Sequence, residues 1–598
     1  MIFNTEFYEK KEEKISNSEQ EIIDKYIEQY ENRDYENQFS EKITAQEIYH
    51  LSSSSQNILN WYPFKEKDTV LEIGGNLGNL TEVFINKCKD ITTIEPNLEK
   101  AKTISKRYKD AQNLEIIVGN FSKIQLEKKF DYIILIGSVP RVKEIMGQDM
   151  KLNQMIQKLE KFLSENGKFL IAVDNKFGLR YFVGNPENIL NKKFESIIGY
   201  NNEPEKIETF TKSRLERKLK EIGYNTNFYY PLPDYKLPNV IFTDKQLPKY
   251  NSVDKYNPYY LENSTIIMNE IDVFREILKN NEEMFTFFTN SFLVEASKKL
   301  EPIKYKYISF NNMRKQEYRL ITKIADEYVE KEVVNQQANE HYENIKENIR
   351  QLQNKDIKTV DYEIDGKIQS KYINQELLLN NVITKALEEN NLEQVENVMN
   401  QYIQTLNINS YQEQNYEKTV FGKYGIEAED KEIIKNLHFQ KRGLWDMTFK
   451  NCFYIDGELY FFDQEWAEDD LPTEYILYRS ILYTISLRRF INIEEWFEKY
   501  DLQKYRILFE KLDNKMQEKV RDEKMWTFYS QNKYFDIDST IQEVINLNIR
   551  NKAQQGAIGN LQKEKEQIQK EYEQYRNMVE QRLSSKIRKT VKRIIKGK

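Results

Sequence analysis

The stretch Asp68-Thr-Val-Leu-Glu-Ile-Gly-Gly-Asn-Leu-Gly-Asn-Leu80 decides the fold of the first part of this chain. Its apolar residues Val70, Leu71 and Ile73 predict a short buried parallel strand, and Glu72 closes that strand. The glycines that follow let the backbone turn sharply into a helix running to about Cys88. A second apolar strand ends in Glu95, 21 residues after Gly74. This order of strand, glycine-rich turn, helix, strand and acid is typical of a nucleoside site, in which the carboxylate grips the ribose hydroxyls.

The spacing of the glycines distinguishes between the nucleoside cofactors that share this layout. A dinucleotide site has Gly-x-Gly-x-x-Gly and seats a pyrophosphate on the helix N-terminus. Here the pattern is Glu72-x-Gly74-Gly75-Asn76-x-Gly78. It resembles the first motif of the class I methyltransferases that use S-adenosylmethionine (SAM), with Asn76 in place of the middle glycine. The acid before the turn would repel a pyrophosphate but suits the cationic methionyl end of SAM. The alternative is an ordinary turn in an unrelated α/β protein.

Further strands follow at residues 114–118, 130–136 and 168–173, with helical segments between them. Alternating strands and helices predict a doubly wound, Rossmann-like parallel sheet. Asn120 stands where the methyltransferases that the chain resembles bind the adenine amine. The segment Gly137-Ser-Val-Pro140 lacks the Asn/Asp-Pro-Pro-Tyr/Phe tetrapeptide of enzymes that methylate exocyclic amines or glutamine amides. That absence argues against a DNA adenine or glutamine methyltransferase.

A short helix before the first of these strands carries His50 and Ser52. Such a helix often covers the cofactor, so both residues are candidates for the pocket. The alternative is a capped helix with a packed histidine.

Composition sets limits on the class of protein. Of the 598 residues, 31% are charged, and the net charge is −7, so we expect no nucleic-acid partner. Two cysteines and three histidines exclude a disulfide framework and argue against a zinc site. No apolar run reaches the ~18 residues of a membrane helix. The first ten residues lack the apolar core of a signal peptide, and a cytoplasmic location is expected.

Composition breaks predict four segments. Residues 1–40 form a helical extension, either a flexible arm or a docking helix, and residues 41–245 form the methyltransferase domain. Residues 260–550 form a second domain, and residues 551–598 form a coiled coil with a basic end. Five of the twelve prolines fall within residues 231–258, which places the main domain boundary there.

The segments after the fifth predicted strand, including residues 174–184 and 230–238, resemble a subgroup of methyltransferases from bacterial gene sets for surface polysaccharide and lipopolysaccharide. Their aromatic residues would stack on sugar rings or simply pack in an aromatic-rich protein. The general base for a hydroxyl acceptor is predicted to be Asp174, which ends the fifth strand.

In the second domain we expect a new sheet to begin at residues 287–296, with two further strands joined by a tight turn at residues 325–327. Residues 452–462 predict a hairpin that turns at Asp456-Gly457. Around it stands the pattern Asp446-x4-Asn451 followed by Asp463-x-Glu465. Transfer of a phosphoryl group from MgATP needs such a set of carboxylates and an amide.

This pattern resembles the small-molecule kinases of the choline and aminoglycoside type. The resemblance implies an α+β kinase-like fold in which Asp446 is the base and Asn451 and Asp463 bind the metal. It also implies that Lys331 contacts the nucleotide phosphates and pairs with Glu340 or Glu343. The chain departs from that pattern in two places: Leu444 replaces a histidine, and no glycine-rich loop precedes Lys331. An inactive kinase-like scaffold is the alternative.

From residue 561 apolar residues recur three, four or seven apart, which predicts an amphipathic helix or coiled coil that could form oligomers. Residues 585–598 hold seven basic residues and no acid. Such an end suits peripheral contact with an anionic membrane or docking on a glycosyltransferase partner, or it is a solvated helix end.

The order of these segments resembles the O-antigen chain-terminating methyltransferase–kinases. The expectation is a membrane-associated enzyme that methylates a sugar hydroxyl or terminal phosphate of a lipid-linked surface glycan, with SAM and possible MgATP as cofactors. Two rivals remain open. One is a methyltransferase with an inactive kinase-like scaffold in a glycan-synthesis complex, and the other is an RNA or protein methyltransferase.

Overall fold

The computed structural model describes residues 1–9, 18–30, 33–200, 207–250, 252, 256–260, 264–530 and 536–596. Its contacts divide the chain into two units. The first comprises Met1–Ser264 and Asn269–Asn532, and the second comprises Thr265–Met268 and Lys533–Lys598. The predicted domain of residues 41–245 lies within the first unit, as does most of the predicted domain of residues 260–550, of which residues 265–268 and 533–550 belong to the second unit. No division between the units falls within residues 231–258.

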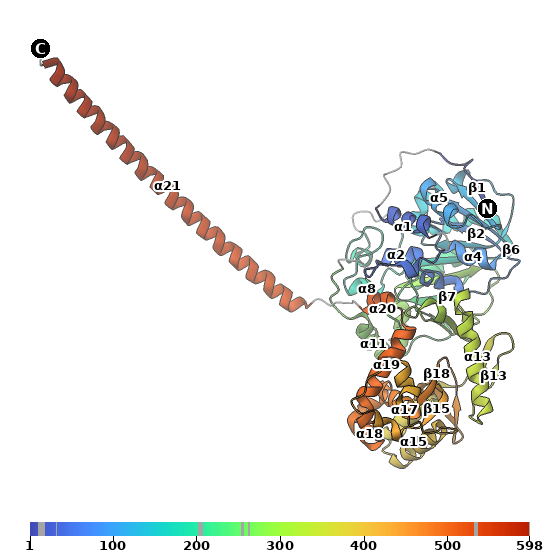
Figure 1. The fold of residues 1–598 in the computed structure, drawn as a ribbon. Coiled ribbons are helices and arrows are strands. Elements are labelled where there is room, and N and C mark those ends of the chain that lie inside the picture. Colours follow the sequence, from blue (N-terminus) through green and yellow to red (C-terminus); the bar gives the residue numbers. More distant parts are fainter. Residues whose placement is uncertain are drawn as a thin grey trace. The chain divides into compact units, whose positions relative to one another are not determined.

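Fourteen strands of the described chain form one sheet, part of which is visible as the blue to green arrows of Figure 1. In spatial order they are β1 (Ile2–Asn4), β4 (Leu114–Val118), β3 (Asp90–Glu95), β2 (Thr69–Ile73), β5 (Phe130–Ile136), β6 (Leu163–Asp174), β9 (Ser291–Ser297), β7 (Asn225–Leu232), β8 (Val240–Thr243), β10 (Tyr307–Phe310), β11 (Leu320–Ile324), β12 (Tyr328–Val333), β14 (Ile368–Lys371) and β13 (Tyr362–Glu363). The six strands from β1 to β6 in this order are parallel, as predicted for the five strands of the first domain.

Alternating side chains of the parallel strands build a core on each face of the sheet. In β5, Ile133 and Leu135 enter one core and Ile134 enters the other, and all three are buried. The helices that cover the sheet in this first part are α1 (Ser18–Gln29), α2 (Ala45–Leu51), α3 (Asn57–Asn60), α4 (Thr81–Lys87), α5 (Leu98–Arg107), α6 (Val142–Met146), α7 (Leu152–Leu159), α8 (Leu179–Phe182), α9 (Glu195–Ile198), α10 (Lys212–Glu221), α11 (Glu270–Asn280) and α12 (Phe285–Phe288). The Rossmann-like fold predicted from the glycine-rich turn is confirmed.

The prediction that a new sheet begins at residues 287–296 is wrong. Strand β9 pairs antiparallel with β6, where Val294 lies opposite Ile171, and with β7, where Val294 lies opposite Phe228. The last strand along the chain that pairs with the parallel strands therefore ends at Ser297, beyond the predicted domain end at residue 245. The partners of β9 are distant in sequence, so its local apolar pattern gives no sign of where it pairs.

The N-terminal extension is joined to the same sheet and does not project as a free arm in its described parts. Strand β1 adds to the edge strand β4, with Phe3 opposite Ile116. Helix α1 packs beside α5, and Thr103 donates a hydrogen bond to Asp24 across this contact at 2.5 Å.

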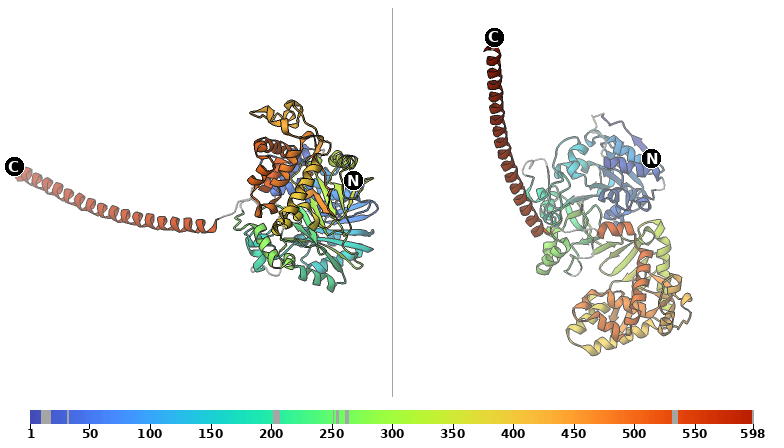
Figure 2. Two further views of the ribbon diagram at one scale, coloured as in Figure 1. Left: turned by 90° about the horizontal axis from the view of Figure 1, so that it is seen from below. Right: turned by 60° about the vertical axis from the view of Figure 1, so that its left-hand side comes forward.

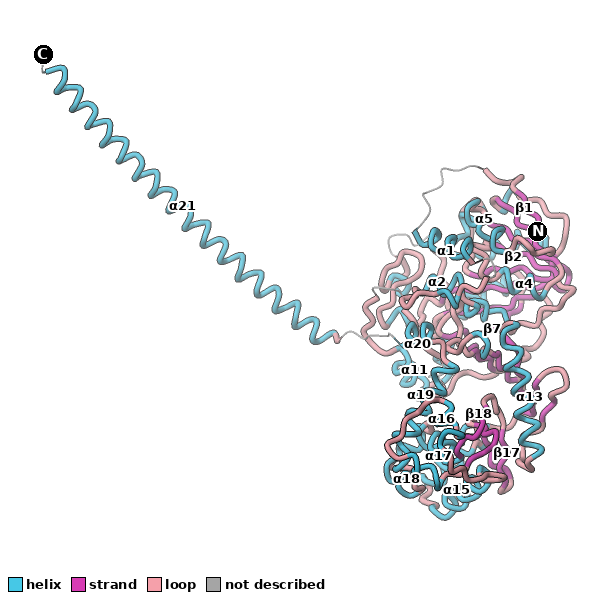
Figure 3. Tube along the Cα trace, in the orientation of Figure 1, coloured by secondary structure: helices cyan, strands magenta, loops and turns pink. Residues whose placement is uncertain are grey.

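The second part continues from β10 into a mostly helical region, in which Figure 3 shows helices predominating around β17 and β18. Its helices are α13 (Asn339–Asn354), α14 (Leu379–Glu388), α15 (Leu392–Leu406), α16 (Val420–Lys423), α17 (Thr473–Leu482), α18 (Ile493–Lys499), α19 (Arg506–Val520) and α20 (Glu523–Ser530). Two small antiparallel pairs are β15 (Phe439–Leu444) with β18 (Ala467–Pro472) and β16 (Cys452–Ile455) with β17 (Glu458–Phe461). The predicted hairpin is confirmed and turns at Asp456 and Gly457, both of which have positive φ.

The last helix, α21 (Ile537–Lys596), is one uninterrupted helix in both views of Figure 2. Its apolar residues, such as Leu561 and Ile568, are exposed. No helix among the described residues is long and apolar enough to cross a bilayer.

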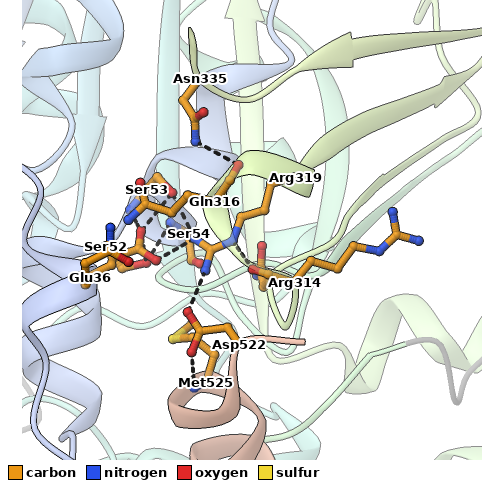
Figure 4. A network of polar contacts seen from close by, with 12 residues as sticks. Glu36, Ser52, Ser53, Ser54, Arg314, Gln316, Arg319, Asn335, Asp522 and Met525 are labelled. Carbon is orange, nitrogen blue, oxygen red and sulfur yellow. Dashed lines mark hydrogen bonds and ion pairs between the residues drawn. The ribbon is translucent and has the colours of Figure 1, made fainter. Parts of the chain in front are cut away.

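A buried arginine links the two parts of the first unit (Figure 4). Arg319, in the connection before β11, is 2% exposed. Its Nη1 donates to Glu36 Oε2 at 2.6 Å, and its Nη2 lies 3.6 Å from Asp522 Oδ2. Glu36 Oε1 also accepts hydrogen bonds from Ser53 N and from the Ser52 hydroxyl. One cation thus fixes the N-terminal extension, the serine turn after α2 and the segment before α20.

We expect Glu36→Gln to lower the stability of the full-length protein by about 3 kcal/mol near neutral pH, because it leaves the buried Arg319 charge without its carboxylate. Burial raises the pKa of Glu36, but Arg319 and the Ser53 amide outweigh it and hold the pKa below its ordinary 4.5. The contribution is therefore present above pH 4.5 and is lost as the pH falls through the lower folded-state pKa.

Denaturant unfolding followed by tryptophan fluorescence, measured across pH, tests this expectation. The exposed Glu66, changed to Gln, is the matched control and should leave the unfolding midpoint unchanged. Equal stability of Glu36→Gln and wild type at pH 7 would contradict a linking role for this ion pair.

Candidate functional site

The glycine-rich turn after β2 lies tightly against β3. Gly74 and Gly78 both have φ +80°, and Asn76 has φ +51°, a conformation that asparagine tolerates better than most residues. The amide of Gly74 donates to Ile94 O at 2.8 Å. A Cβ on Gly75 would lie 2.3 Å from the Thr93 methyl group, so a side chain there would displace the turn from β3.

Glu72 is buried at the start of this turn. Its Oε2 accepts hydrogen bonds from the hydroxyls of Thr81 and Thr93, each at 2.8 Å. Burial raises the pKa of Glu72 to about 7, and the two hydroxyl donors only partly offset that rise. The carboxyl is thus poised to gain full charge when a cation comes beside it.

A cavity of about 240 Å³ opens at the carboxyl ends of β2, β5 and β6. Five residues of the predicted site line it: Glu72, Gly74, Gly75, Asn76 and Asp174. Tyr49, His50, Arg141 and Tyr235 also line it.

Glu95 ends β3 as predicted, but both of its oxygens are already engaged. Oε2 accepts from the amide of Asn76 at 2.8 Å and Oε1 accepts from the amide of Asn97 at 3.1 Å. Arg141 Nη2 lies 2.9 Å from Oε1, so its guanidinium stands between this carboxylate and the cavity. Sequence reasoning missed Arg141; its place four residues after Gly137 was the only available signal.

Gly78 and Asn120 lie behind the cavity and do not line it. Gly78 O accepts a hydrogen bond from the Tyr108 hydroxyl at 2.6 Å, and a Cβ on Gly78 would meet the same ring at 3.0 Å. Asn120 packs beside Gly147, and its buried Oδ1 has no hydrogen-bond partner. That unpartnered acceptor suits the amine that the predicted role of Asn120 requires.

The helix before β2 does cover the cavity. His50 lines it, and burial lowers the pKa of His50 to about 3, so its imidazole is neutral at physiological pH. Its Nδ1 is buried without a partner. Ser52, the other candidate, instead caps the next turn and holds Glu36.

Asp174 lies at the junction of two spaces. It lines the 240 Å³ cavity and also a small adjoining chamber of about 30 Å³, which Tyr181, Tyr200 and Phe210 enclose. Its Oδ2 accepts from Asn188 Nδ2 at 3.0 Å, and its Oδ1 is buried without a partner. Burial raises the pKa of Asp174 above its ordinary value.

The predicted phosphate-transfer residues of the second part form a separate charged cluster. Lys331 pairs with Asp463 and with Glu465, and Arg314 also pairs with Glu465. Burial alone would lower the pKa of Lys331, but the two carboxylates outweigh it and raise that pKa. The predicted partner of Lys331, Glu340, is exposed on α13 and takes no part in the cluster.

The other predicted partner, Glu343, pairs with Lys346 at 2.7 Å and lies outside the same cluster. A helix residue was expected to neutralise Lys331, but two side chains after β17 already do so.

Asp446 and Asn451 lie close together beside that cluster. Asn451 Nδ2 donates to the backbone carbonyl of Asp446 at 3.0 Å. Burial, with a further contribution from Glu465, raises the pKa of Asp446 to about 7. Asp463 has φ +58° and follows β17 as predicted. Within the described ranges, no group of three or more His, Cys, Asp and Glu side chains is arranged to hold a metal, so the metal roles of Asn451 and Asp463 stay predictions.

A mainly apolar cavity of about 190 Å³ adjoins this cluster. Lys331 and Asp463 lie at its polar side, and Tyr362, Phe453 and Phe462 contribute its aromatic walls. Tyr362 Oη accepts a hydrogen bond from the amide of Asp463 at 3.0 Å, which fixes the start of the segment that carries Glu465.

The sheet order, the glycine-rich turn and the cavity beside Glu72 define the first part as a class I SAM-dependent methyltransferase fold. The cavity fits the cationic end of SAM at Glu72, whereas Asn120, whose buried Oδ1 has no partner, does not line it. Glu95 is available to the ribose once Arg141 moves aside.

Comparison with known proteins refines this class. Residues 40–156 match the family model described as ribosomal RNA adenine dimethylase. A 75-residue segment is 39% identical to a probable ribosomal RNA small subunit methyltransferase A of Methanococcoides burtonii, covering 12% of this chain and 28% of that protein. Another, of 79 residues, is 40% identical to a probable dimethyladenosine transferase of Dictyostelium discoideum, covering 13% of this chain and 24% of that protein. The chain thus spans about a quarter of the length of these relatives.

A longer but weaker similarity is to the ribosomal RNA small subunit methyltransferase A of Borreliella burgdorferi, with 21% identity over 254 residues, 42% of this chain and 76% of that protein. Among solved structures, a SAM-dependent methyltransferase from Aquifex aeolicus has 14% identity and a TM-score of 0.22, covering 30% of this chain and 84% of that chain.

These comparisons correct three sequence-based predictions. A surface-glycan methyltransferase is wrong, because the matching family and the named relatives are ribosomal RNA methyltransferases. The description as a kinase-like enzyme of polysaccharide or lipopolysaccharide biosynthesis conflicts with the same names. The expectation of a glycan acceptor, and of no nucleic-acid partner, is wrong for the same reason.

We expect Arg141→Ala to bind SAM several-fold more tightly than the wild type. The ribose hydroxyls would then no longer compete with a guanidinium for Glu95. Calorimetric titration of SAM into the full-length protein measures the change. Lys143→Ala, at an exposed position on helix α6, which begins directly after Arg141, is the control and should bind as the wild type does. Weaker binding by Arg141→Ala would mean that Arg141 contacts the cofactor directly.

Proposed function

We propose that the protein is a SAM-dependent methyltransferase that acts on RNA. The observation that carries the proposal is the 240 Å³ cavity, whose glycine-rich turn lies within the residues matched by the ribosomal RNA adenine dimethylase model, whereas Asp174 lies beyond them. The RNA-modifying relatives in three different organisms support the same acceptor class.

The chemistry that SAM supplies is a methyl group activated on a sulfonium sulfur. In-line transfer chiefly requires that the acceptor atom be held against that methyl group. It also requires a group that takes the proton from the acceptor. Glu72 and Glu95 would fix the two ends of the cofactor. Asp174 is the residue we assign to the acceptor, because its buried Oδ1 has no partner and it lines both the cavity and the adjoining chamber.

The adjoining chamber suits a nucleobase better than a sugar hydroxyl. Tyr181, Tyr200 and Phe210 surround it with aromatic rings, on which a splayed-out base can stack. A carboxylate at its mouth can accept a hydrogen bond from a base N–H. The chamber of about 30 Å³ is smaller than a base, so a base would have to displace some of the residues around it.

The acceptor loop departs from the enzymes that methylate exocyclic amines. Residues 137–140 are Gly-Ser-Val-Pro, and the Ser138 hydroxyl donates to Ile73 O at 2.6 Å instead of facing an acceptor. The proposal therefore names RNA as the acceptor class, and the methylated atom is to be read from the product nucleoside.

The first test is transfer of a labelled methyl group from SAM to unmodified small-subunit ribosomal RNA made by transcription. We expect incorporation by the wild type and at least a hundred-fold loss in Asp174→Asn, because that change removes the proton acceptor. SAM affinity of the variant should stay near that of the wild type. Mass spectrometry of the digested RNA identifies the methylated nucleoside. Failure of the SAM-bound wild type to label any RNA would overturn the proposed function.

For the second part we propose a site that holds a nucleotide. The specific observation is the cavity of about 190 Å³, with aromatic walls and with Lys331 and Asp463 at one side. The aromatic walls suit a base, and the lysine suits a phosphate. Glu465 and Asp463 already neutralise Lys331, so a nucleotide phosphate would need a divalent cation to enter between them.

We expect MgATP to bind the full-length protein and Asp463→Asn to lose that binding, because the amide removes the charge that holds magnesium. Calorimetric titration of ATP, with and without magnesium, measures this binding. Asp456→Asn is the matched control: it makes the same change at another aspartate with positive φ, in the hairpin turn. No heat of binding with the wild type would leave this part as a scaffold without nucleotide.

The coiled-coil assignment of residues 551–598 and the basic end stay predictions, as do membrane contact, oligomer formation and a cytoplasmic location. The described residues of α21 form a helix with exposed apolar side chains.

A further inference from the structure

A further cavity of about 290 Å³ lies on the methyltransferase part and shares no lining residue with the 240 Å³ cavity, here called the cofactor cavity. Its walls come from the end of α1 with the segment after it and from the end of α5. Basic side chains outnumber acidic ones along it: four residues are basic and two are acidic, namely Arg33, Lys106, Arg107, Lys109, Glu28 and Asp110. We call it the basic cavity.

The deepest of these cations is incompletely satisfied. Arg107 is 6% exposed, and its Nε is buried without a hydrogen-bond partner. No carboxylate of the described chain forms an ion pair with it; the rings of Tyr35 and Tyr108 lie 5.3 and 5.6 Å from its guanidinium carbon. A buried arginine is rarely left without an anion. The wall of the basic cavity thus holds a buried arginine with one unpartnered N–H, on which Glu82 acts only from beyond ion-pair distance.

Two of the more exposed cations differ in how closely a carboxylate approaches them. Lys106 pairs with Glu28 at 2.6 Å. Arg33 reaches only 3.9 Å from Glu82, and its side chain is 41% exposed. An arginine so placed can present its planar set of N–H donors to an incoming anion.

The basic cavity is connected to the cofactor site through the same buried arginine. Arg107 Nη1 donates to His50 O at 2.7 Å and approaches Leu77 O at 3.4 Å. His50 lines the cofactor cavity, and Leu77 lies within the glycine-rich turn between Asn76 and Gly78. An anion held at Arg107 would therefore lie next to helix α2 and the glycine-rich turn, both of which line the cofactor cavity.

We propose that the basic cavity binds a phosphate group of the RNA substrate and so docks the RNA beside the catalytic cavity. This inference rests on the proposed RNA methyltransferase function. The phosphodiester backbone is the recurring anion of that substrate, and contacts to it supply position and much of the affinity without reading sequence. Free phosphate has the same chemistry and is the competing source.

The test compares two double variants of the full-length protein that remove the same charge. Arg33→Gln with Lys109→Gln alters the basic cavity, whereas Arg217→Gln with Lys220→Gln alters exposed positions on α10. Binding of small-subunit ribosomal RNA is measured at several salt concentrations, together with SAM affinity and inorganic phosphate binding.

We expect the cavity variant to bind RNA about ten-fold more weakly, with the slope of log affinity against log salt reduced by roughly one per lost phosphate contact. The α10 variant should keep the wild-type slope, and SAM affinity should be unchanged in both. Equal slopes for the two variants would overturn the docking site. Loss of inorganic phosphate binding without any change in RNA affinity would instead assign the cavity to a free phosphate. If the SAM-bound wild type neither binds nor methylates RNA, the proposed function itself fails.

Discussion

The two parts of the first unit depend on one buried cation, Arg319. A guanidinium that is 2% exposed is costly unless it is paired, so the segments that pair with it have to assemble together. Glu36 comes from the N-terminal extension and Asp522 from the segment before α20, nearly 500 residues apart in sequence. Arg319 Nε also donates to Arg314 O at 2.7 Å, and Arg314 pairs with Glu465. Arg319 therefore contacts the serine turn after α2 and, through Arg314, the charged cluster of the second part.

The continuous sheet is a second connection between the two parts of the first unit. Strand β8 pairs with both β7 and β10, so the last strands of the methyltransferase fold and the first strands of the second part share hydrogen bonds. Asn312, in the connection after β10, accepts from Asn57 at 2.7 Å and donates to Pro238 O at 3.0 Å. A composition break marks flexible sequence, but here it contains β8, which pairs on both sides, and hydrogen-bonded strands cannot move as independent domains.

What the sequence predicted correctly is local. The turn after β2 needs glycine, or a residue such as asparagine, at positive φ, and the strands beside it are apolar runs; both signals lie within a few residues. The hairpin at Asp456 and Gly457 was predicted for the same reason. What the sequence did not show is pairing over distance. Arg141 occupies Glu95 from 46 residues away, β9 enters between two strands of the first domain, and Lys331 meets carboxylates more than 130 residues later. No short-range pattern encodes these contacts.

The prediction that the chain has no nucleic-acid partner failed for a physical reason that concerns charge. A net charge of −7 spread over 598 residues was taken to exclude nucleic acid. Exposed charges are screened beyond about 8–10 Å at physiological salt, so a phosphate responds only to its near neighbours. The wall of the basic cavity has four cations against two carboxylates, whatever the rest of the chain carries. An acidic protein can therefore hold RNA at one basic place, and its overall acidity would then limit nonspecific binding elsewhere on its surface.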